Sequence, residues 1–234
     1  MAVCGIDIGN LNTVIAQAQR GGIDIILNEN SNRLNPSMVS FQGKQRMIGE
    51  AAATIARSNY KSTVTNIKRL IGRKWHEPEL QKEVARLPFT VVKVGEDDVG
   101  VEVSYNDESV VLRIEQVLAM LLVKCQDIVL KSQGGNVILA DSVVGIPAWY
   151  TDTHRRSFKS ACQIAGLNCL RLMHEPTAVA LSYGIYKNAR NEFHESEAKR
   201  VMFIDMGHSQ FSATVVSFIK GSLTVQSCVC DANL

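Results

Sequence analysis

One short pattern occurs twice in this chain of 234 residues, and it constrains the fold more than any other feature. Each copy predicts a strand that ends in an aspartate, a glycine turn, a second strand, another turn and a third strand. The first strands end in Ile6–Gly9 and Ile204–Gly207, so the equivalent aspartates lie 205 − 7 = 198 residues apart. The repeat therefore predicts two similar β-meanders, each with a carboxylate beside a glycine turn.

The region between the meanders alternates between helical and strand-like patterns. Apolar residues at 114–129 recur at the spacing of one helix face, and residues 152–165 and 176–186 predict two more helices. Asp141–Ile146 predicts a short apolar strand, and residues 167–173 predict a second, buried strand. This alternation is typical of an α/β fold with mixed strand pairing.

Two segments differ from this alternation. Residues from about 40 to 113 predict an inserted subdomain with its own helices and strands. Residues 187–200 are polar and charged, which predicts an exposed linker between two lobes. We therefore expect a first lobe at residues 1–188 and the beginning of an incomplete second lobe at residues 189–234.

Charge and apolar content argue against several classes of partner. With 25 basic and 23 acidic residues the net charge is +2, which disfavours binding to nucleic acid or to an anionic membrane. The longest apolar run, Val117–Val123, has seven residues, whereas about 20 are needed to cross a bilayer. Asp7 comes too early for a secretory signal. The six cysteines lack the short, repeated spacing of zinc ligands and are expected to be buried, reduced thiols.

The two repeated turns suit a phosphate-binding site. Backbone N–H groups at glycine turns bind phosphate oxygens because no side chain blocks a close approach. Two carboxylates beside a polyphosphate would repel it, so we expect a divalent cation between them, and Mg²⁺ fits such oxygen-only surroundings. A single turn of this kind could be a simple hairpin, but two equivalent turns facing each other across a cleft favour a nucleotide-phosphate clamp.

Five ordered motifs extend over essentially the whole chain. They read VCGIDIG, VVGIPAWYT, IAGLNCLRL, EPTAVALSYG and FIDMGHS, at residues 3–9, 143–151, 164–172, 175–184 and 203–209. Together they resemble the ATPase domain of the seventy-kilodalton heat-shock chaperone superfamily. The residues at 151–156 and 205–209 resemble its large, hundred-and-ten-kilodalton branch, because the ordinary branch has consecutive glycines after the second aspartate.

The resemblance implies an α/β, actin-like ATPase fold of the ribonuclease-H type, in two lobes, with ATP or ADP and Mg²⁺ in the cleft. Asp7 and Asp205 would hold the water shell of the metal ion. The residues that would cradle the phosphates are Gly9, Asn10, Leu11, Asn12, Gly207, His208 and Ser209.

The same resemblance implies roles for four further residues. Lys68 would reach the γ-phosphate region and Glu175 would orient the attacking water, so both are expected to be catalytic. Pro147 and Arg155 would relay the nucleotide state to a substrate-binding part. Each also has a plainer interpretation. Lys68 lies in a basic stretch typical of a solvated face, Glu175 suits the start of a helix, Pro147 could end a strand, and Arg155 could be a surface residue.

The chain departs from the hydrolysing branch around both turns. Asn10 and Leu11 replace hydroxyl residues, and the segment with Gln210 and Ser212 lacks an expected threonine and carboxylate. We therefore expect an ATP-binding chaperone with at most slow hydrolysis. It would act as nucleotide-exchange factor and co-chaperone for ordinary seventy-kilodalton chaperones in the cytoplasm, and also in the nucleus.

Unfolded client proteins would bind such a chaperone through regions beyond this chain. Three alternatives remain open on the residues. The first is an actively ATP-hydrolysing chaperone, the second a small-molecule kinase of the same fold, and the third a structural fragment without a ligand. Neither nucleic acid nor a membrane is expected as a partner.

Overall fold

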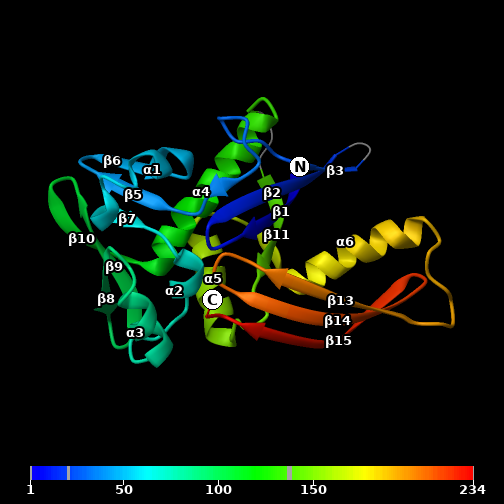
Figure 1. Ribbon diagram of the computed structural model, residues 1–234. Helices are drawn as coiled ribbons and strands as arrows, with labels where there is room; N and C mark the ends of the chain where they lie inside the picture. Colours follow the sequence, from blue (N-terminus) through cyan, green and yellow to red (C-terminus); the bar gives the residue numbers. More distant parts are fainter. Residues whose placement is uncertain (1, 20–21, 136–138, 234) are drawn as a thin grey trace. The chain divides into compact units, whose positions relative to one another are not determined.

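The computed structural model describes residues 2–19, 22–135 and 139–233 (Figure 1). The chain forms two compact units. Unit 1 contains Met1–Val144 and Thr151–Arg171, and unit 2 contains Gly145–Tyr150 and Leu172–Leu234. None of the helices in the described part of the chain is long and apolar enough to cross a membrane.

The main sheet has six strands and is built around the first meander. Its strand order is β12-β11-β1-β2-β3, and β4 pairs with β2. The strand bounds are β1 Ala2–Ile8, β2 Asn12–Gln19, β3 Gly22–Ile25, β4 Asn35–Pro36, β11 Leu139–Ile146 and β12 Cys169–His174. Alternate side chains of β1 are buried, as the period of a strand with one covered face predicts. Ile6, Ile8 and Ile15 are almost fully buried and form part of the core.

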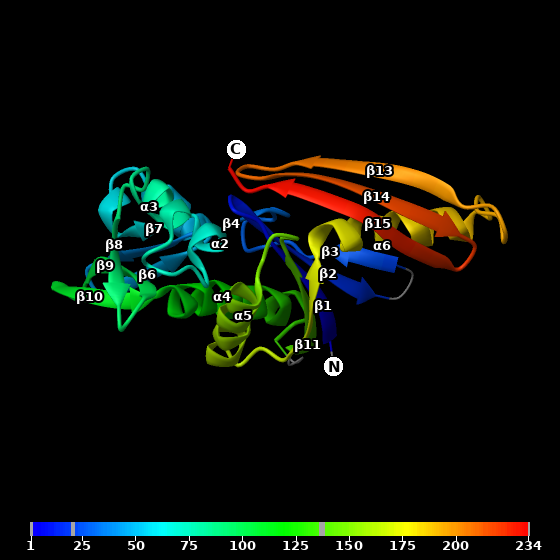
Figure 2. The ribbon, with the colours of Figure 1, turned by 90° about the horizontal axis from the view of Figure 1, so that it is seen from below.

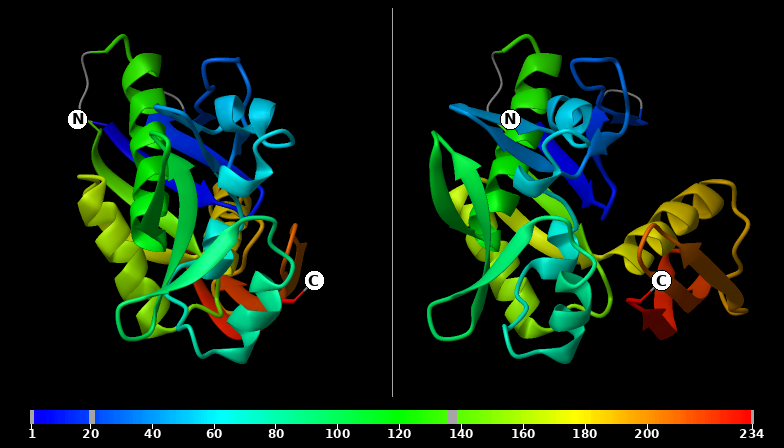
Figure 3. Two further views of the ribbon diagram at one scale, coloured as in Figure 1. Left: turned by 90° about the vertical axis from the view of Figure 1, so that its left-hand side faces the viewer. Right: turned by 60° about the vertical axis from the view of Figure 1, so that its left-hand side comes forward.

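Two helices of unit 1 pack against each other (Figure 3). Helix α4 spans Ile114–Ser132 and helix α5 spans Asp152–Ile164. Nine residues of α4 are buried, from Ile114 to Val129, at the spacing that the sequence predicted. At the start of the helix, Oε1 of Gln116 accepts the backbone N–H of Arg113 at 2.9 Å.

The predicted insertion contains two small antiparallel sheets with strand orders β6-β5-β7 and β10-β9-β8. The first sheet has short strands, and the second is a β-meander. Short helices lie between their strands along the chain. Their bounds are β5 Val39–Gln42, β6 Gln45–Ile48, α1 Glu50–Ile55, η1 Tyr60–Ser62, β7 Thr63–Val64, α2 Ile67–Leu70, α3 Pro78–Val84, β8 Thr90–Val94, β9 Asp98–Tyr105 and β10 Glu108–Arg113. These elements agree with the prediction that the insertion has its own helices and strands.

Unit 2 consists of one helix against one three-stranded sheet (Figure 2). The elements are α6 Glu175–Ala189, β13 Lys199–Met206, β14 Phe211–Ile219 and β15 Ser222–Asp231. Ala180, Phe193, Val216 and Phe218 form its core. Gly184 of α6 lets the helix approach the sheet, because a Cβ there would lie 2.9 Å from the ring of Phe218.

The internal repeat is confirmed by strand register. Asp7 of β1 pairs with Val14 of β2, and Asp205 of β13 pairs with Ser212 of β14. The partners are separated by 212 − 14 = 198 residues, as the aspartates are by 205 − 7 = 198. Both copies therefore pair their first two strands at the same positions.

The two lobes expected at residues 1–188 and 189–234 stay a prediction, and helix α6 groups with β14 and β15 in unit 2. Two other expectations from the sequence need correction. The polar segment 187–200 is not exposed throughout, because its Phe193 stacks on Phe218 at 5.2 Å between ring centroids. The strand predicted as buried, β12, leaves Leu170 58% exposed.

The prediction that all cysteines are buried is also wrong. Cys4, Cys125 and Cys162 are buried, but Cys228 and Cys230 are exposed. Both exposed cysteines lie on β15, the edge strand of the unit 2 sheet. An edge strand buries less of each side chain than a central strand does, and the sequence pattern alone does not reveal which strand is at the edge.

Candidate functional site

The turn between β1 and β2 provides the first half of the predicted site. The backbone N–H of Gly9 donates to the carbonyl oxygen of Asn12 at 2.9 Å, which closes the turn. A Cβ on Gly9 would lie 2.4 Å from that same oxygen, so only glycine fits without a backbone shift. Asp7, two residues earlier on β1, is exposed. The turn thus combines close-packed backbone with a solvent-facing carboxylate.

Strand β4 and the residue after it hold this turn from behind. The N–H of Ser37 donates to the carbonyl oxygen of Leu11 at 2.8 Å. The hydroxyls of Thr13 and Ser37 are 2.9 Å apart and buried, and the amide of Asn35 donates to the carbonyl oxygen of Thr13 at 3.2 Å. These contacts leave the turn little freedom to move, which suits a preorganised anion site.

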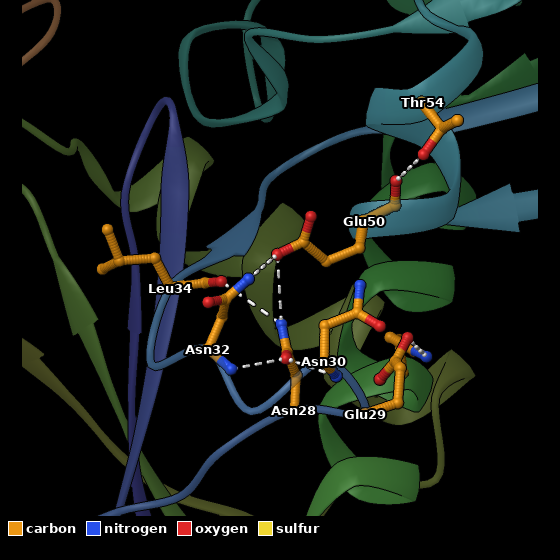
Figure 4. Close-up of polar contacts among 8 residues, drawn as sticks. Asn28, Glu29, Asn30, Asn32, Leu34, Glu50 and Thr54 are labelled. Atoms are coloured by element: carbon orange, nitrogen blue, oxygen red, sulfur yellow. Dashed lines mark hydrogen bonds and ion pairs between the residues drawn. The ribbon is translucent and has the colours of Figure 1, made fainter.

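The loop that precedes β4 is itself fixed by an asparagine (Figure 4). The Oδ1 atom of Asn28 accepts the backbone N–H groups of Asn30 and Asn32, both at 2.9 Å. The amide of Asn32 donates to Oε1 of Glu50 at 2.8 Å, which ties the loop to α1. The support of the Gly9 turn therefore extends into the inserted subdomain.

Lys68 lies in α2 and is connected to the same turn through its neighbour Asn66. The amide of Asn10 donates to Oδ1 of Asn66 at 3.4 Å, and the amide of Asn66 donates to Glu83 at 2.7 Å. Asn66 has a φ of 53°, a left-handed conformation that asparagine tolerates better than most residues. Glu83 also forms an ion pair with Arg69 at 2.9 Å. Lys68 is 8% exposed, so the basic stretch is not a solvated face at this residue.

Arg155 lies on α5, and the start of that helix contacts the loop that follows α2. Gly72 has a φ of 70°, and a Cβ there would lie 2.4 Å from the Cα of His154. The ring of His154 is buried and hydrogen-bonds Thr151 at 2.7 Å through Nδ1. Burial, with a smaller effect of the Arg73 charge, lowers the pKa of His154 to about 4. His154 is therefore neutral at physiological pH.

The turn between β13 and β14 provides the second half of the predicted site. The N–H of Gly207 donates to the carbonyl oxygen of Gln210 at 2.9 Å, as in the Gly9 turn. A Cβ on Gly207 would lie 3.6 Å from that oxygen, an ordinary contact. Asp205 is exposed on β13, two residues before the glycine. The backbone of the turn is repeated, but its tight packing is not.

Side chains rather than backbone groups surround the Gly207 turn. The amide nitrogen of Gln210 donates to Oε2 of Glu175 at 2.8 Å, and its oxygen accepts the indole N–H of Trp149 at 3.0 Å. Trp149 follows Pro147, which is buried and whose carbonyl oxygen accepts the N–H of Tyr150 at 3.3 Å. Gln210 therefore joins the start of α6 to the loop that contains Pro147.

Comparison with known proteins identifies the family of the chain. The family described as Hsp70 protein matches residues 3–234. The chain belongs to the Hsp70 family. Similarity to individual members of the Hsp70 family indicates which branch the chain resembles.

The chain is 44% identical over 223 residues to "Heat shock protein 110" of Caenorhabditis elegans, which is 95% of this chain and 29% of that protein. It is 44% identical over 237 residues to "Heat shock 70 kDa protein 4L" of Homo sapiens, which is 100% of this chain and 28% of that protein. It is 41% identical over 234 residues to "97 kDa heat shock protein" of Strongylocentrotus purpuratus, which is 100% of this chain and 26% of that protein.

These similarities confirm the resemblance to the large heat-shock branch and the predicted fold class. The Hsp70-family ATPase domain has the actin-like fold, and the mixed α/β structure around the six-stranded sheet agrees with it. The chain spans less than a third of the length of these relatives. Its membership makes it part of a heat-shock chaperone ATPase domain.

The predicted site residues fall into two groups in this Hsp70-family chain. Unit 1 holds Asp7, the Gly9–Asn12 turn, Lys68 and Arg155, and unit 2 holds the remainder. That remainder is Pro147, Glu175, Asp205, Gly207, His208 and Ser209. Within unit 1 the Asn10–Asn66 contact links the turn to the helix of Lys68, and within unit 2 Gln210 lies beside Glu175.

Sequence reasoning missed four residues that organise these groups. They are Asn66, Glu83, Trp149 and Gln210, the last of which the sequence marked only as a departure from the family. One signal was available for Gln210, since it stands 210 − 12 = 198 residues after Asn12 and so occupies the equivalent turn position. No comparable signal existed for Asn66 and Glu83, whose contact depends on how the insertion folds.

The residues present fit a magnesium nucleotide. Within the residues that the structure describes, no group of three or more His, Cys, Asp or Glu side chains could enclose a metal ion. Isolated exposed carboxylates suit Mg²⁺, which keeps several waters and is bound by one or two carboxylates together with substrate phosphates. The absence of a Cβ at Gly9 keeps one turn open for close approach of a phosphate oxygen.

Proposed function

We propose that this chain is the ATP-binding part of a large heat-shock chaperone that serves as nucleotide-exchange factor for ordinary seventy-kilodalton chaperones. The observation that carries the proposal is the pair of glycine turns, which repeat with the same register and the same 2.9 Å closing hydrogen bond. The names of the relatives, among them "Heat shock protein 110" and "97 kDa heat shock protein", support the choice of the large branch.

In this proposal the glycine turn of each unit binds phosphate oxygens. Mg²⁺ bound with ATP neutralises charge on the phosphate oxygens. Asp7 and Asp205 accept hydrogen bonds from the water shell of the ion, and the backbone N–H groups of the Gly9 and Gly207 turns donate to phosphate oxygens. Lys68 supplies positive charge for the γ-phosphate. The proposal requires no side-chain ligand that contacts the metal ion directly.

Slow hydrolysis is proposed for two reasons that concern the chain's own residues. Leu11 is 46% exposed in the first turn, where a hydroxyl would orient water or phosphate, and its side chain cannot donate a hydrogen bond. In the second turn Gln210 donates to Oε2 of Glu175, which occupies one of the two oxygens that would accept a proton from water. Loss of positioning groups reduces phosphoryl transfer by about 10²-fold or more.

Thermal shift and titration calorimetry with Mg-ATP test the binding half of the proposal. Asp7→Ala and Asp205→Ala should each remove most of the stabilisation by ATP, which at 100 times the Kd amounts to about 2.7 kcal/mol. Asp24→Ala, which removes an exposed carboxylate on β3 away from the turn, is the matched control and should keep the full shift. If both turn variants retain the shift of the unsubstituted chain, the nucleotide assignment is wrong.

The exchange function is tested with the complete gene product. We expect it to accelerate release of ADP from a seventy-kilodalton chaperone, and to lose this effect when ATP is omitted. A charge-removing variant, Lys68→Met, should slow hydrolysis while exchange continues, because exchange needs bound nucleotide and not turnover. Loss of exchange in proportion to hydrolysis would contradict the proposal.

An actively hydrolysing ATPase is the second candidate. The presence of Lys68 and of Glu175, at the start of α6, favours it. Single-turnover hydrolysis of ATP separates the two candidates, because the proposal expects nucleotide to stay bound far longer than in an ordinary seventy-kilodalton chaperone. A rate equal to that of the ordinary chaperone would favour this second candidate.

A further inference from the structure

Two exposed thiols lie side by side on β15, at the edge of the unit 2 sheet. The sulfur atoms of Cys228 and Cys230 are 3.9 Å apart. Both side chains are exposed, in contrast to the buried thiols of Cys4, Cys125 and Cys162. The pair takes no part in the proposed nucleotide site, so its proximity calls for an explanation of its own.

A β-bulge determines that these two side chains share a face with Thr214. The pairing of β14 with β15 shifts register between Val215 and Val216, so Val216 pairs with Val225 but Thr214 pairs with Cys228. Without the extra residue, Ser227 would continue the face of Val225, and the cysteines would lie on the opposite face. The bulge therefore brings two thiols together with a hydroxyl.

The hydroxyl of Thr214 adds a donor to the pair. Its Oγ1 donates to the sulfur of Cys228 at 3.1 Å, and the Thr214 side chain is 1% exposed. Hydrogen bonds to a sulfur stabilise its deprotonated form, which is the form that binds metals. The sulfurs themselves remain accessible from solvent.

Disulfide formation is unfavourable for this pair. Residues two apart on one strand have Cα atoms about 6.7 Å apart, from a rise of about 3.35 Å per residue. Disulfides usually join Cα atoms that are about 5.5–6 Å apart, and about 6.8 Å is the upper end of their range. The estimated separation of the two Cα atoms lies at the long end of this range, so a disulfide is disfavoured relative to two thiols.

The separation of the sulfurs fits one metal ion between them. With metal–sulfur bonds of about 2.3 Å, sulfurs 3.9 Å apart subtend an angle of about 116° at the metal. That angle is close to the 120° of trigonal coordination. Among the described residues no third His, Cys, Asp or Glu completes a metal-binding group, whereas structural zinc sites need four protein ligands. Thiolate ligands favour copper(I), a soft ion that accepts three ligands.

We propose that Cys228 and Cys230 form a two-thiolate binding site for copper(I), with a small thiol from solution as the third ligand. Binding breaks the S–H bonds of both cysteines and of the small thiol, forms three Cu–S bonds and releases three protons to solvent. No electrons are transferred.

Proton release makes binding depend on pH in a known direction. Each thiol loses its proton when the ion binds, because the thiolate is the form that binds metals. Copper(I) affinity should therefore rise as the pH is raised from 6 to 8.

Anaerobic titration of the reduced chain with the copper(I) complex of bicinchoninate, in buffer that contains a small thiol, tests the proposal. We expect one equivalent of copper(I) to leave the chelator for the protein, with sulfur-only coordination by X-ray absorption. Cys228→Ser and Cys230→Ser should each weaken binding by about 10²–10⁴-fold, because the second sulfur then no longer binds intramolecularly. Circular dichroism checks that each serine variant is folded.

A second pair of thiols in the same chain supplies the matched control. Cys162 hydrogen-bonds Cys169, but Cys162 is 2% exposed. The double variant Cys162→Ser, Cys169→Ser should still bind one equivalent of copper(I). Thr214→Val should weaken copper(I) binding less than either serine substitution on β15 does. Retention of binding by the Cys228→Ser, Cys230→Ser double variant would overturn the proposal, and so would a preference for Zn²⁺ over copper(I).

Discussion

The Gly9 turn of unit 1 and the Gly207 turn of unit 2 share one backbone geometry but differ in what holds them. Each is closed by a 2.9 Å hydrogen bond from the glycine to the residue three positions later. The Gly9 turn is packed so closely that a Cβ would lie 2.4 Å from a carbonyl oxygen, and backbone groups around Ser37 support it. The Gly207 turn has room for a Cβ, and the side chain of Gln210 supports it.

The two turns therefore repeat a backbone conformation without repeating the contacts that hold it in place. The Gly9 turn is held by the backbone of Ser37 and by the side chains of Asn35 and Ser37, all in or directly after strand β4 of unit 1. Unit 2 instead uses a side-chain network that reaches the start of α6 and the loop with Pro147. We therefore expect substitutions at equivalent positions of the two turns to have unequal effects.

The largest expected difference concerns the glycines themselves. Gly9→Ala should lower the free energy of unfolding of unit 1 by about 1–3 kcal/mol, because the new Cβ overlaps the carbonyl oxygen of Asn12. Gly207→Ala should change unit 2 by only about 0.5 kcal/mol. Hydrogen exchange with mass spectrometry reports the two units separately. Equal effects of the two substitutions would contradict the unequal support.

The second difference concerns the residue that closes each turn. Gln210→Ala should destabilise unit 2 by about 1–2 kcal/mol, because Glu175 and Trp149 each lose a hydrogen-bond partner. Asn12→Ala, the equivalent change in unit 1, should cost less, since backbone groups hold that turn. The fluorescence of Trp149, measured with Trp75 replaced by phenylalanine, should shift in the Gln210 variant. An unchanged spectrum and stability would show that the network does not support the turn.

The third difference concerns acid. The pKa of His154 is about 4 in the folded chain and about 6.5 when unfolded, so the unfolded state binds more protons between these values. The contribution of His154 to the free energy of unfolding should be fully present above pH 6.5. It should fall as the pH is lowered toward 4, by on the order of 1–2 kcal/mol at pH 5.

This loss should affect unit 1, because His154 packs against Gly72 after the helix of Lys68. His154→Gln should flatten the pH profile of unit 1 between pH 7 and 5. A His154→Gln profile that keeps the slope of the unsubstituted chain would contradict this assignment. Denaturant unfolding monitored at several pH values decides between these outcomes.

The smallest expected effect concerns Asn66, which links the first turn to the helix of Lys68. Asn66→Gly keeps the left-handed backbone but loses the hydrogen bond to Glu83, whereas Asn66→Ala loses both. The alanine variant should therefore be less stable than the glycine variant by about 1 kcal/mol. Equal stabilities in denaturant unfolding would mean that the strain of this residue is not significant.

Several elements followed directly from local sequence. The period of apolar residues predicted α4, and the paired Asp-x-Gly patterns predicted both meanders with their offset of 198 residues. Both signals depend on residues that are neighbours in one helix or one hairpin, and local geometry decides their spacing. The same local patterns allowed the candidate residues Asp7, Gly9, Asp205 and Gly207 to be predicted from the sequence.

Tertiary structure decided the features that depend on distant partners. Phe193 is buried because Phe218 stacks on it from β14, although its own segment is polar. Cys228 and Cys230 share the face of Thr214 because of a bulge in the pairing with β14, which no residue of β15 announces. The contact of Asn66 with Glu83 likewise depends on two helices of the insertion.

The sequence by itself determined the repeated strand–turn–strand backbone and the identity of the residues at its two turns. Only the tertiary structure decided how each turn is held, by β4 and Ser37 in one unit and by Gln210 in the other. The physical reason is that a turn conformation depends on a few adjacent residues. Packing and hydrogen bonding depend on groups tens of residues away, whose positions are known only once the chain has folded.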